Sequence, residues 1–358
     1  MVVMSNSLGT TGAMWEPQLR ALVQRFRVVR YEHRGHGGTA ALPGPYTLED
    51  LGGDLLEVID SLEVEGVSMI GLSLGAMVGM WLAANPPGRV ERLVVACAAG
   101  SLPPASAWEQ RARLVRESGT PSLLETLLGR WFTPEFLERS PAMAGVVAGM
   151  LEQTSPEGYA ACAEAVGSAD LWASLASIRA PTLVLAGDAD PVVDPAMALR
   201  VHQAIPGSSF RVIPHGAHLL NLEQASAFNS AVMEHLCGTA IERGQAVRRA
   251  VLGDAHVERS DAAAGGFGGS FVDFITRYAW GEVWTRPGLD RRTRSALTVA
   301  VLTALGRSEE LELHLRAALR NGMSEEEIAE VLIHTAVYAG VPASNSAFAL
   351  ARRVLEDR

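Results

Sequence analysis

Apolar and polar positions alternate in two different ways along the chain. From residue 2 to about residue 236, short β-branched apolar runs alternate with segments of helical spacing, which predicts a parallel sheet covered by helices. The predicted strands are residues 2–5, 27–32, 67–72, 92–98, 182–187 and 210–214. Between residues 102 and 176 this alternation stops. Helical segments with Pro and Gly breaks there predict an inserted cap.

Beyond Cys237 and Gly238 the pattern is helical throughout. It predicts helices over 242–252, 271–284, 290–305, 309–320, 325–338 and 343–356, with 260-SDAAAGGFGG-269 as a flexible link. The charge changes at the same boundary, from −9 over residues 1–240 to −1 over residues 241–358. We therefore predict two domains: an α/β hydrolase-type domain over 1–238, with its cap at about 102–176, and an all-α domain over 241–358.

Composition excludes several classes of function. All 30 basic residues are arginine, and the absence of lysine excludes Schiff-base chemistry, a phosphate-loop lysine and Ser-x-x-Lys hydrolases. The net charge of −10 argues against a nucleic-acid partner. The uncharged apolar runs are too short to span a bilayer, and the N-terminus lacks the features of a signal peptide.

Cysteine usage points to a reducing compartment. Cys97, Cys162 and Cys237 are odd in number and far apart, so neither a disulfide framework nor a thiolate metal site is expected. We predict a cytoplasmic protein without a metal or other cofactor.

The clearest chemical motif is Gly71-Leu72-Ser73-Leu74-Gly75. It follows the apolar strand 67–72 and begins a helical run. Glycine on both sides allows a turn from strand to helix tight enough to expose the Ser73 hydroxyl at the end of the sheet. The pattern predicts Ser73 as a nucleophile.

A serine nucleophile needs a histidine and a carboxylate, which this fold places downstream. Two acids, Asp188 and Asp190, follow the strand 182–187, and two histidines, His215 and His218, follow the strand 210–214. We favour Asp190, with Asp188 as a turn residue, and His218, with His215 as a polar loop residue.

The first half resembles the α/β-hydrolase family and, within it, the 3-oxoadipate enol-lactone hydrolases. The matching segments are 5-SNSLGTTGAMW-15, 31-YEHRGHGGT-39, GLSLG, 130-RWFTPEF-136 and 185-LAGDADPVV-193. The resemblance implies an oxyanion hole formed by the backbone N–H groups of Leu8 and Leu74. Family members carry an antiparallel hairpin ahead of the first strand, for which this chain has no residues. This implies a start further upstream or an exposed sheet edge.

Within the cap, Arg130 and Trp131 combine a bidentate cation with an aromatic wall. This pair suits the free carboxylate of a short dicarboxylic lactone. The alternative is a surface arginine beside a core tryptophan. We interpret Arg34 and His36, in the HRGHG turn, as structural.

The helical half contains histidines but no metal motif. His314 lies on one predicted helix, and His334 and Tyr338 share a face of the next at i and i+4. Glu330 lies another four residues before His334, so a metal site is conceivable, but the segment 334-HTAVY-338 has neither a second histidine nor a carboxylate, and no metal is predicted.

The helical half resembles 4-carboxymuconolactone decarboxylases of the alkyl hydroperoxide reductase D superfamily over nearly all of 241–358. The matching segments are 280-WGEVWTRPGLDRRTRSALT-298, 314-HLRAALRNGMSEEEIAEVLIHTAVYAGVP-342 and the closing Ala-rich helix. The redox members of that superfamily have cysteines where this chain has Arg307 and Glu310, so peroxidase chemistry is excluded. The lactone itself accepts the electrons left by CO2, so the resemblance implies a cofactor-free decarboxylation.

Such a reaction needs groups that bind carboxylates and a group that protonates carbon. Arg291 and Arg294 suit the first task. For the proton donor we rank His314, then His334, then Glu282, with Tyr338 as an orienting hydroxyl; each histidine could also be merely hydrogen-bonded.

Together, the two resemblances imply a bifunctional enzyme of protocatechuate breakdown that acts on small dicarboxylate lactones and self-associates through its C-terminal domain. The alternative is another serine esterase or lactonase whose helical half serves only for oligomerisation.

Overall fold

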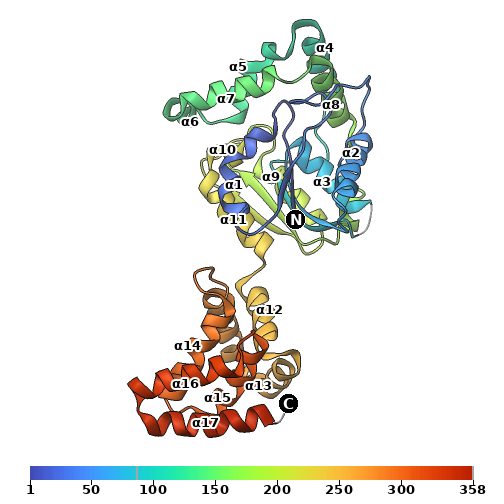
Figure 1. The fold of residues 1–358 in the computed structure, drawn as a ribbon. Helices are drawn as coiled ribbons and strands as arrows, with labels where there is room; N and C mark the ends of the chain where they lie inside the picture. The colour runs from blue at the N-terminus through green and yellow to red at the C-terminus, as the bar shows by residue number, and fades with distance from the viewer. Residues whose placement is uncertain (86–87, 357–358) are drawn as a thin grey trace. The chain divides into compact units, whose positions relative to one another are not determined.

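The computed structural model describes residues 1–85 and 88–356, which form two compact units, Met1–Leu236 and Cys237–Arg358. The first unit is built on a six-stranded sheet in the order β2-β1-β3-β4-β5-β6, with every neighbouring pair parallel (Figure 1). The strands are β1 (Val2–Ser5), β2 (Val28–Arg30), β3 (Val67–Leu72), β4 (Val90–Ala96), β5 (Thr182–Gly187) and β6 (Ser209–Ile213).

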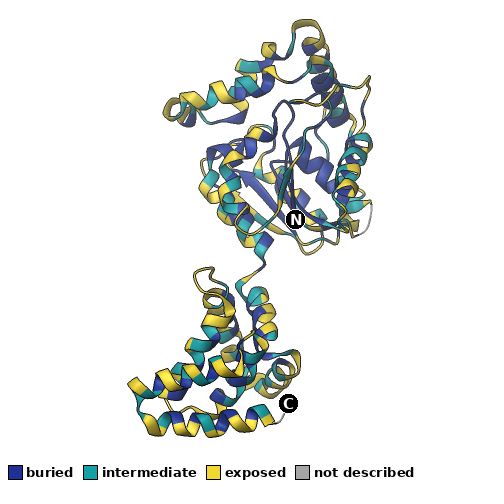
Figure 2. Cartoon of the chain, in the orientation of Figure 1, coloured by how far each residue is buried: buried dark blue, intermediate teal, exposed yellow. Residues whose placement is uncertain are grey.

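The sheet is central because its middle strands are apolar on both faces. Strands β1, β3 and β5 are buried at every position, as expected where helices cover both faces of a parallel sheet (Figure 2). The elements of the first unit outside the cap are η1 (Gly12–Trp15), α1 (Glu16–Leu22), α2 (Leu48–Ser61), α3 (Leu74–Ala84), η3 (Leu175–Ser177), α9 (Pro195–Ala204), α10 (Leu220–Glu223) and α11 (Ala225–Cys237).

A helical cap interrupts the sheet between β4 and β5. It comprises α4 (Ala105–Ser118), η2 (Thr120–Leu123), α5 (Leu124–Trp131), α6 (Pro134–Arg139), α7 (Pro141–Glu152) and α8 (Pro156–Ser168). Proline stands in the first turn of α6, α7 and α8, where its missing N–H costs no helical hydrogen bond. The cap covers the edge of the sheet where the strands end, so it determines what reaches the residues there (Figure 1).

The second unit is helical throughout its described residues. Its elements are α12 (Ala240–Leu252), α13 (Asp254–Ile275), the π-helix η4 (Thr276–Val283), α14 (Arg291–Ala304), α15 (Ser308–Arg320), α16 (Glu325–Ala339) and α17 (Val341–Glu356). One apolar cluster joins α14 to α17, and a second packs α12, α13 and η4 against α15.

The prediction of a flexible link over residues 260–269 is wrong. This segment belongs to α13 and is helical except at Gly265, where φ is 48° and ψ is −162°. The alanines 262–264 favour a helix, and the break falls on a glycine because a residue with a Cβ avoids that conformation. The glycines therefore confine the irregularity to a kink. In the described residues, no helix combines the length and apolar character needed to cross a membrane.

Candidate active site

Ser73 stands on the tight turn between β3 and α3. Its backbone has φ 54° and ψ −116°, a conformation that residues with a side chain rarely adopt. A Cβ at position 75 would lie 2.1 Å from the carbonyl oxygen of Ser5, and one at position 71 would lie 2.4 Å from that of Gly75. Only glycine fits at these two positions, so the motif allows the strand and the helix to meet closely enough to present the serine.

Three residues from separate strand ends meet in a hydrogen-bonded chain. The Oγ of Ser73 lies 2.9 Å from Nε2 of His218, and Nδ1 of His218 lies 2.9 Å from Oδ2 of Asp190. All three residues are buried. The structure thus joins the three residues favoured in the sequence. A histidine held between a carboxylate and a hydroxyl can take the hydroxyl proton while its ring stays oriented.

The second oxygen of Asp190 is held by the backbone. Its Oδ1 accepts hydrogen bonds from the N–H groups of Val192, at 2.8 Å, and Val193, at 3.1 Å. These bonds leave Oδ2 directed at the imidazole.

A possible metal-ligand set also lies here. Ligand atoms of Cys97, Asp190 and His218 lie within 4.8 Å of one another, the one such group found in residues 1–85 and 88–356. Burial and the charge of Asp190 raise the pKa of the Cys97 thiol well above its ordinary value, so it is protonated at neutral pH. Nδ1 of His218 is already bonded to the carboxylate. This donor set suits proton transfer and fits a metal poorly.

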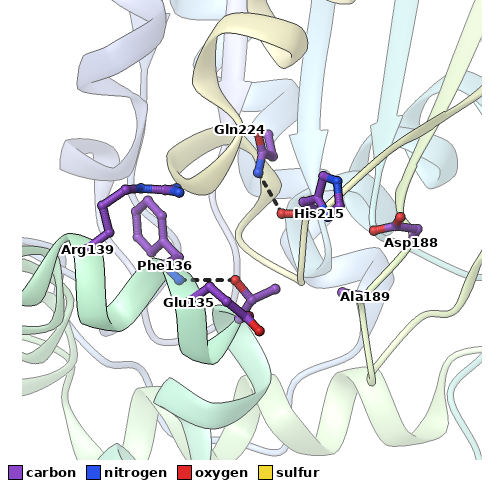
Figure 3. A pocket seen from close by; sticks show the side chains of 8 residues that line it. Glu135, Phe136, Arg139, Asp188, Ala189, His215 and Gln224 are labelled. Carbon is purple, nitrogen blue, oxygen red and sulfur yellow. Dashed lines mark hydrogen bonds between the residues drawn. The ribbon is translucent and has the colours of Figure 1, made fainter.

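Asp188 and His215 face a different cavity. They line a cleft of about 490 Å³ between α6 and the loops that follow β5 and β6, opposite Phe136 and Arg139 (Figure 3). His215 has a left-handed backbone with φ 56°, and its carbonyl accepts a hydrogen bond from Gln224 at 2.6 Å. Both side chains are exposed and take no part in the Ser73 hydrogen-bonded chain.

Two backbone N–H groups are available beside Ser73. Leu8 lies in the loop after β1 and lines the same pocket, and Leu74 is the first residue of α3. In the part of the chain that the structure describes, neither N–H has a protein acceptor. His36 fixes the Leu8 loop, since its Nε2 accepts a bond from the Gly9 N–H at 3.0 Å while Nδ1 contacts the Arg34 carbonyl at 3.0 Å. Burial lowers the pKa of His36 to about 4, which keeps Nε2 free to accept.

The pocket over Ser73 contains two arginines of the cap. Arg130 from α5 lines it, as predicted, and so does Arg111 from α4, which the sequence analysis did not identify. The Arg111 guanidinium lies 4.6 Å from the ring centre of Trp108. Among the ion pairs of the described residues, none involves either guanidinium, but the Arg111 side chain is hydrogen-bonded to the Tyr159 hydroxyl. The remaining walls come from Ser7, Leu8, Leu127, Trp131, Tyr159, Val192 and His218.

This pocket is both cationic and tight. The charges of Arg111 and Arg130 act on the Tyr159 hydroxyl, whose pKa burial raises above its ordinary value. The free space is about 30 Å³, enough for one or two water molecules. A larger ligand can therefore enter only if cap side chains or the cap itself move. Two guanidiniums without a carboxylate partner among the described residues, above a nucleophile, suit a small anionic ester or lactone.

In the second unit, His314 on α15 is the most enclosed of the predicted residues. Its ring is stacked on that of Trp280, with centroids 6.5 Å apart and an interplanar angle of 7°. Its Nδ1 is buried without a hydrogen-bond partner among the described residues. Burial and the nearby His256 lower its pKa below the ordinary value. A cleft of about 390 Å³ beside it is lined by His256, Arg259, Glu309, Glu310, Glu312, Leu313 and Arg316.

The other predicted residues of this unit have surroundings different from those of His314. His334 and Tyr338 contact each other on the exposed face of α16, with ring centroids 5.2 Å apart. Arg294 donates hydrogen bonds to the carbonyls of Leu289 and Arg286, and thereby holds the loop before α14. Arg291 and Glu282 are exposed. Among the described contacts, none joins His314 to any of these residues.

A parallel sheet with a serine on the turn after its third strand defines the first unit as an α/β hydrolase. Residues 1–225 match the family described as alpha/beta hydrolase fold, and residues 270–353 match the carboxymuconolactone decarboxylase family. The chain belongs to the α/β hydrolase family over its first unit and to the carboxymuconolactone decarboxylase family over its second, and both resemblances in the sequence are confirmed.

Individual relatives match each half separately. 3-Oxoadipate enol-lactonase 2 of Acinetobacter baylyi is 39% identical over 64% of this chain and 86% of its own length. 4-Carboxymuconolactone decarboxylase of the same organism is 51% identical over 32% of this chain and 87% of its own length. The crystal structure of the enol-lactonase from Burkholderia xenovorans LB400 is 38% identical and superposes with a TM-score of 0.65, covering 66% of this chain and 91% of that one.

Proposed function

We propose that the chain is a bifunctional enzyme of protocatechuate breakdown. The helical unit would decarboxylate 4-carboxymuconolactone, and the α/β unit would hydrolyse the resulting 3-oxoadipate enol-lactone to 3-oxoadipate. Relatives named for these two activities match the two units separately, and the product of one reaction is the substrate of the other. The observation that carries the hydrolase half is the buried Ser73–His218–Asp190 chain in a pocket lined by the guanidiniums of Arg111 and Arg130.

In the hydrolase, Ser73 attacks the lactone carbonyl while its proton passes to Nε2 of His218. Asp190 stabilises the imidazolium that forms. The N–H groups of Leu8 and Leu74 stabilise the oxyanion, aided by the positive end of α3. When the ring C–O bond breaks, His218 gives its proton to the departing enol oxygen, which stays attached to the acyl chain on Ser73. The neutral His218 then activates a water that hydrolyses the acyl-enzyme, and the enol tautomerises to the ketone of 3-oxoadipate.

Arg111 and Arg130 bind the free carboxylate of the lactone. Each guanidinium presents a planar fork of donors, and the half-buried Arg111 is held against an aromatic ring, so less side-chain freedom is lost on binding. Trp131 packs as a wall beside them, and its side chain is almost fully buried. The pair gives the pocket a preference for anionic over neutral esters.

In the decarboxylase, we assign proton delivery to His314. It is enclosed, stacked and has an unpaired nitrogen, whereas His334 and Tyr338 lie on an open face and form a second candidate site. Arg259 in the adjacent cleft is our candidate for binding a substrate carboxylate. Arg316 in the same cleft is already paired with Glu312, Arg294 holds a loop, and Arg291 is exposed. The reaction needs no cofactor because the unsaturated lactone accepts the electrons left by CO2.

We further propose that copies of the chain associate through the helical unit. Large apolar side chains are exposed there at Phe267, Phe271, Phe274, Tyr278, Leu297, Val301, Leu305, Ile333, Val337, Tyr338 and Val341. Exposed apolar side chains in such number are typical of a surface that another protein covers. Sedimentation of the purified chain tests this: a monomer at micromolar concentration would contradict it. Buried thiols at Cys97 and Cys162 suit a reducing cytoplasm.

The deciding experiment gives the purified chain 4-carboxymuconolactone and follows CO2 and the organic products. The wild type should release CO2 and yield 3-oxoadipate, and Ser73→Ala should release CO2 but accumulate the enol-lactone. If the chain hydrolyses added enol-lactone but never releases CO2, the helical unit has no decarboxylase activity, and its role is association alone.

A further inference from the structure

Glu223, at the end of α10, is a buried carboxylate that the catalytic chain does not use. Its Oε1 accepts the backbone N–H of Thr133 at 2.9 Å and also the Thr133 hydroxyl. Its Oε2 accepts the backbone N–H of Ala217 at 2.6 Å. Glu223 is 6% exposed, and both of its carboxylate oxygens accept hydrogen bonds. Burying a carboxylate without hydrogen-bond donors costs free energy of folding. The three donor groups, two from Thr133 and one from Ala217, are therefore held in place around it.

The two oxygens of this carboxylate bind two segments with different functions. Thr133 is the N-cap of α6 and follows the pocket residues Arg130 and Trp131 by two to three positions. Ala217 immediately precedes His218. A second bond runs in parallel, from the N–H of Leu219 to the carbonyl of Trp131 at 2.9 Å. The residues on both sides of His218 are therefore held to the cap segment that follows Arg130, one of them through Glu223.

This joint lies beside open space. Past Thr133 the cap helix α6 stands away from the loops after β5 and β6, with the 490 Å³ cleft between them (Figure 3). The Ser73 pocket, in contrast, has only about 30 Å³ of free space, so a lactone enters only if cap side chains or the cap itself move. During either movement, the bonds to Glu223 and Leu219 keep one point of the cap fixed next to the histidine.

We infer that Glu223 is a positioning residue that couples carboxylate binding in the cap to the placement of His218. This inference rests on the proposed hydrolase function. When substrate engages Arg130 and Trp131, the Thr133–Glu223–Ala217 connection keeps that segment in register with the imidazole. Breaking the connection should weaken recognition of the anionic group more than it weakens ester cleavage itself.

The test uses two variants and two chromogenic esters. Glu223→Gln keeps the shape but has one acceptor oxygen, so it can accept the backbone N–H of Thr133 or that of Ala217 but not both. Thr133→Val removes the hydroxyl bond to Glu223, together with the N-cap bond that this hydroxyl accepts from the Phe136 N–H. The esters are neutral 4-nitrophenyl acetate and the anionic 4-nitrophenyl monoester of glutaric acid. Glu138→Gln, an exposed carboxylate on α6, is the matched control.

We expect each variant to raise KM for the anionic ester about tenfold, with KM for the neutral ester within twofold of the wild-type value. The double variant should lose no more than the worse single one, because both act through one connection. An equal fall in kcat for both esters at unchanged KM would overturn the inference. A double variant whose rise in KM for the anionic ester equals the product of the two single rises would overturn it as well. Should Glu223→Gln fail to fold, Thr133→Val still tests the inference. An unchanged ratio of KM for the anionic ester to KM for the neutral ester in this variant would overturn the inference. Ester cleavage that persists in Ser73→Ala would instead overturn the hydrolase proposal, and this inference with it.

Discussion

The Nε2 of His218 lies 2.9 Å from the Oγ of Ser73, although 145 residues separate the two in sequence. Ser73 follows β3 and His218 follows β6, and two strands lie between them in the sheet. With strands about 4.8 Å apart, those strand ends are roughly 14 Å from each other. The loop after β6 must therefore run back across the sheet edge, and its contacts with the cap at Trp131 and, through Glu223, at Thr133 hold it there.

Ser73→Ala should separate the two proposed activities. Removing the nucleophile should lower the rate of lactone opening by roughly 10⁴-fold or more, while decarboxylation stays at the wild-type rate because it uses the other unit. Both rates are measured on one preparation, with the exposed Ser226→Ala as control. Wild-type lactone opening in Ser73→Ala would remove this serine from the mechanism.

Asp190→Asn and Asp188→Asn form a matched pair two residues apart. Asp190 bonds Nδ1 of His218, so the amide should favour the wrong tautomer and lower kcat by on the order of 10⁴-fold. Asp188 is exposed and accepts only a long bond from the Gly216 N–H, at 3.4 Å, so its substitution should cost less than threefold. The opposite ranking would assign the acid to Asp188.

Arg111→Gln and Arg130→Gln should each impair acidic substrates selectively. Losing one charge-assisted hydrogen bond costs about 1.5–3 kcal/mol, which corresponds to roughly a 10- to 150-fold lower kcat/KM for the lactone acid. The neutral methyl ester should be nearly unaffected. Arg113→Gln, exposed on the same helix as Arg111, is the control. Equal losses on acid and ester would show that the arginines only support the cap.

Two buried histidines should make the first unit acid-sensitive. Burial lowers the pKa of His36 to about 4 and that of His33 to about 3, whereas both histidines have a pKa of 6.5 in the unfolded chain. As pH falls from 6.5 toward 3, the unfolded state gains protons that the folded state does not, so the free energy of unfolding decreases.

Urea titrations at several pH values measure this effect. Each histidine contributes up to ~1.4 kcal/mol per pH unit within its window. His36→Gln should flatten the dependence between pH 6.5 and 4, and the exposed His215→Gln should not. A wild-type slope in His36→Gln would show that this residue titrates normally.

His314→Asn should slow decarboxylation at least tenfold without changing lactone opening. Burial and His256 lower the pKa of His314, so its protonated form becomes scarcer as pH rises, and kcat/KM for decarboxylation should fall with increasing pH. In D2O the product should carry one deuterium at the protonated carbon. Full activity in His314→Asn together with a loss in His334→Asn would place the reaction on the α16 face.

Local sequence signals determined much of this protein. The alternation of apolar runs predicts six strands because a buried strand needs only a few β-branched residues in succession, and all six are present. The Gly71–Gly75 motif identifies Ser73 because the turn it requires is itself local. The same kind of signal gave a wrong prediction at residues 260–269. The glycines there suggested a flexible link, but the neighbouring alanines favour a helix, and the segment is helical except at Gly265.

Tertiary structure decided what no local signal carries. Arg111, Arg113 and Arg116 all lie on α4, and which of them faces Ser73 depends on how that helix is rotated about its axis as it packs. The choice between two acids and two histidines depends on loop paths, which bring Asp190 and His218 inward and leave Asp188 and His215 at an outer cleft. The role of Glu223 exists only where cap and sheet meet, because hydrogen bonds between distant segments depend on three-dimensional packing and not on spacing along the chain.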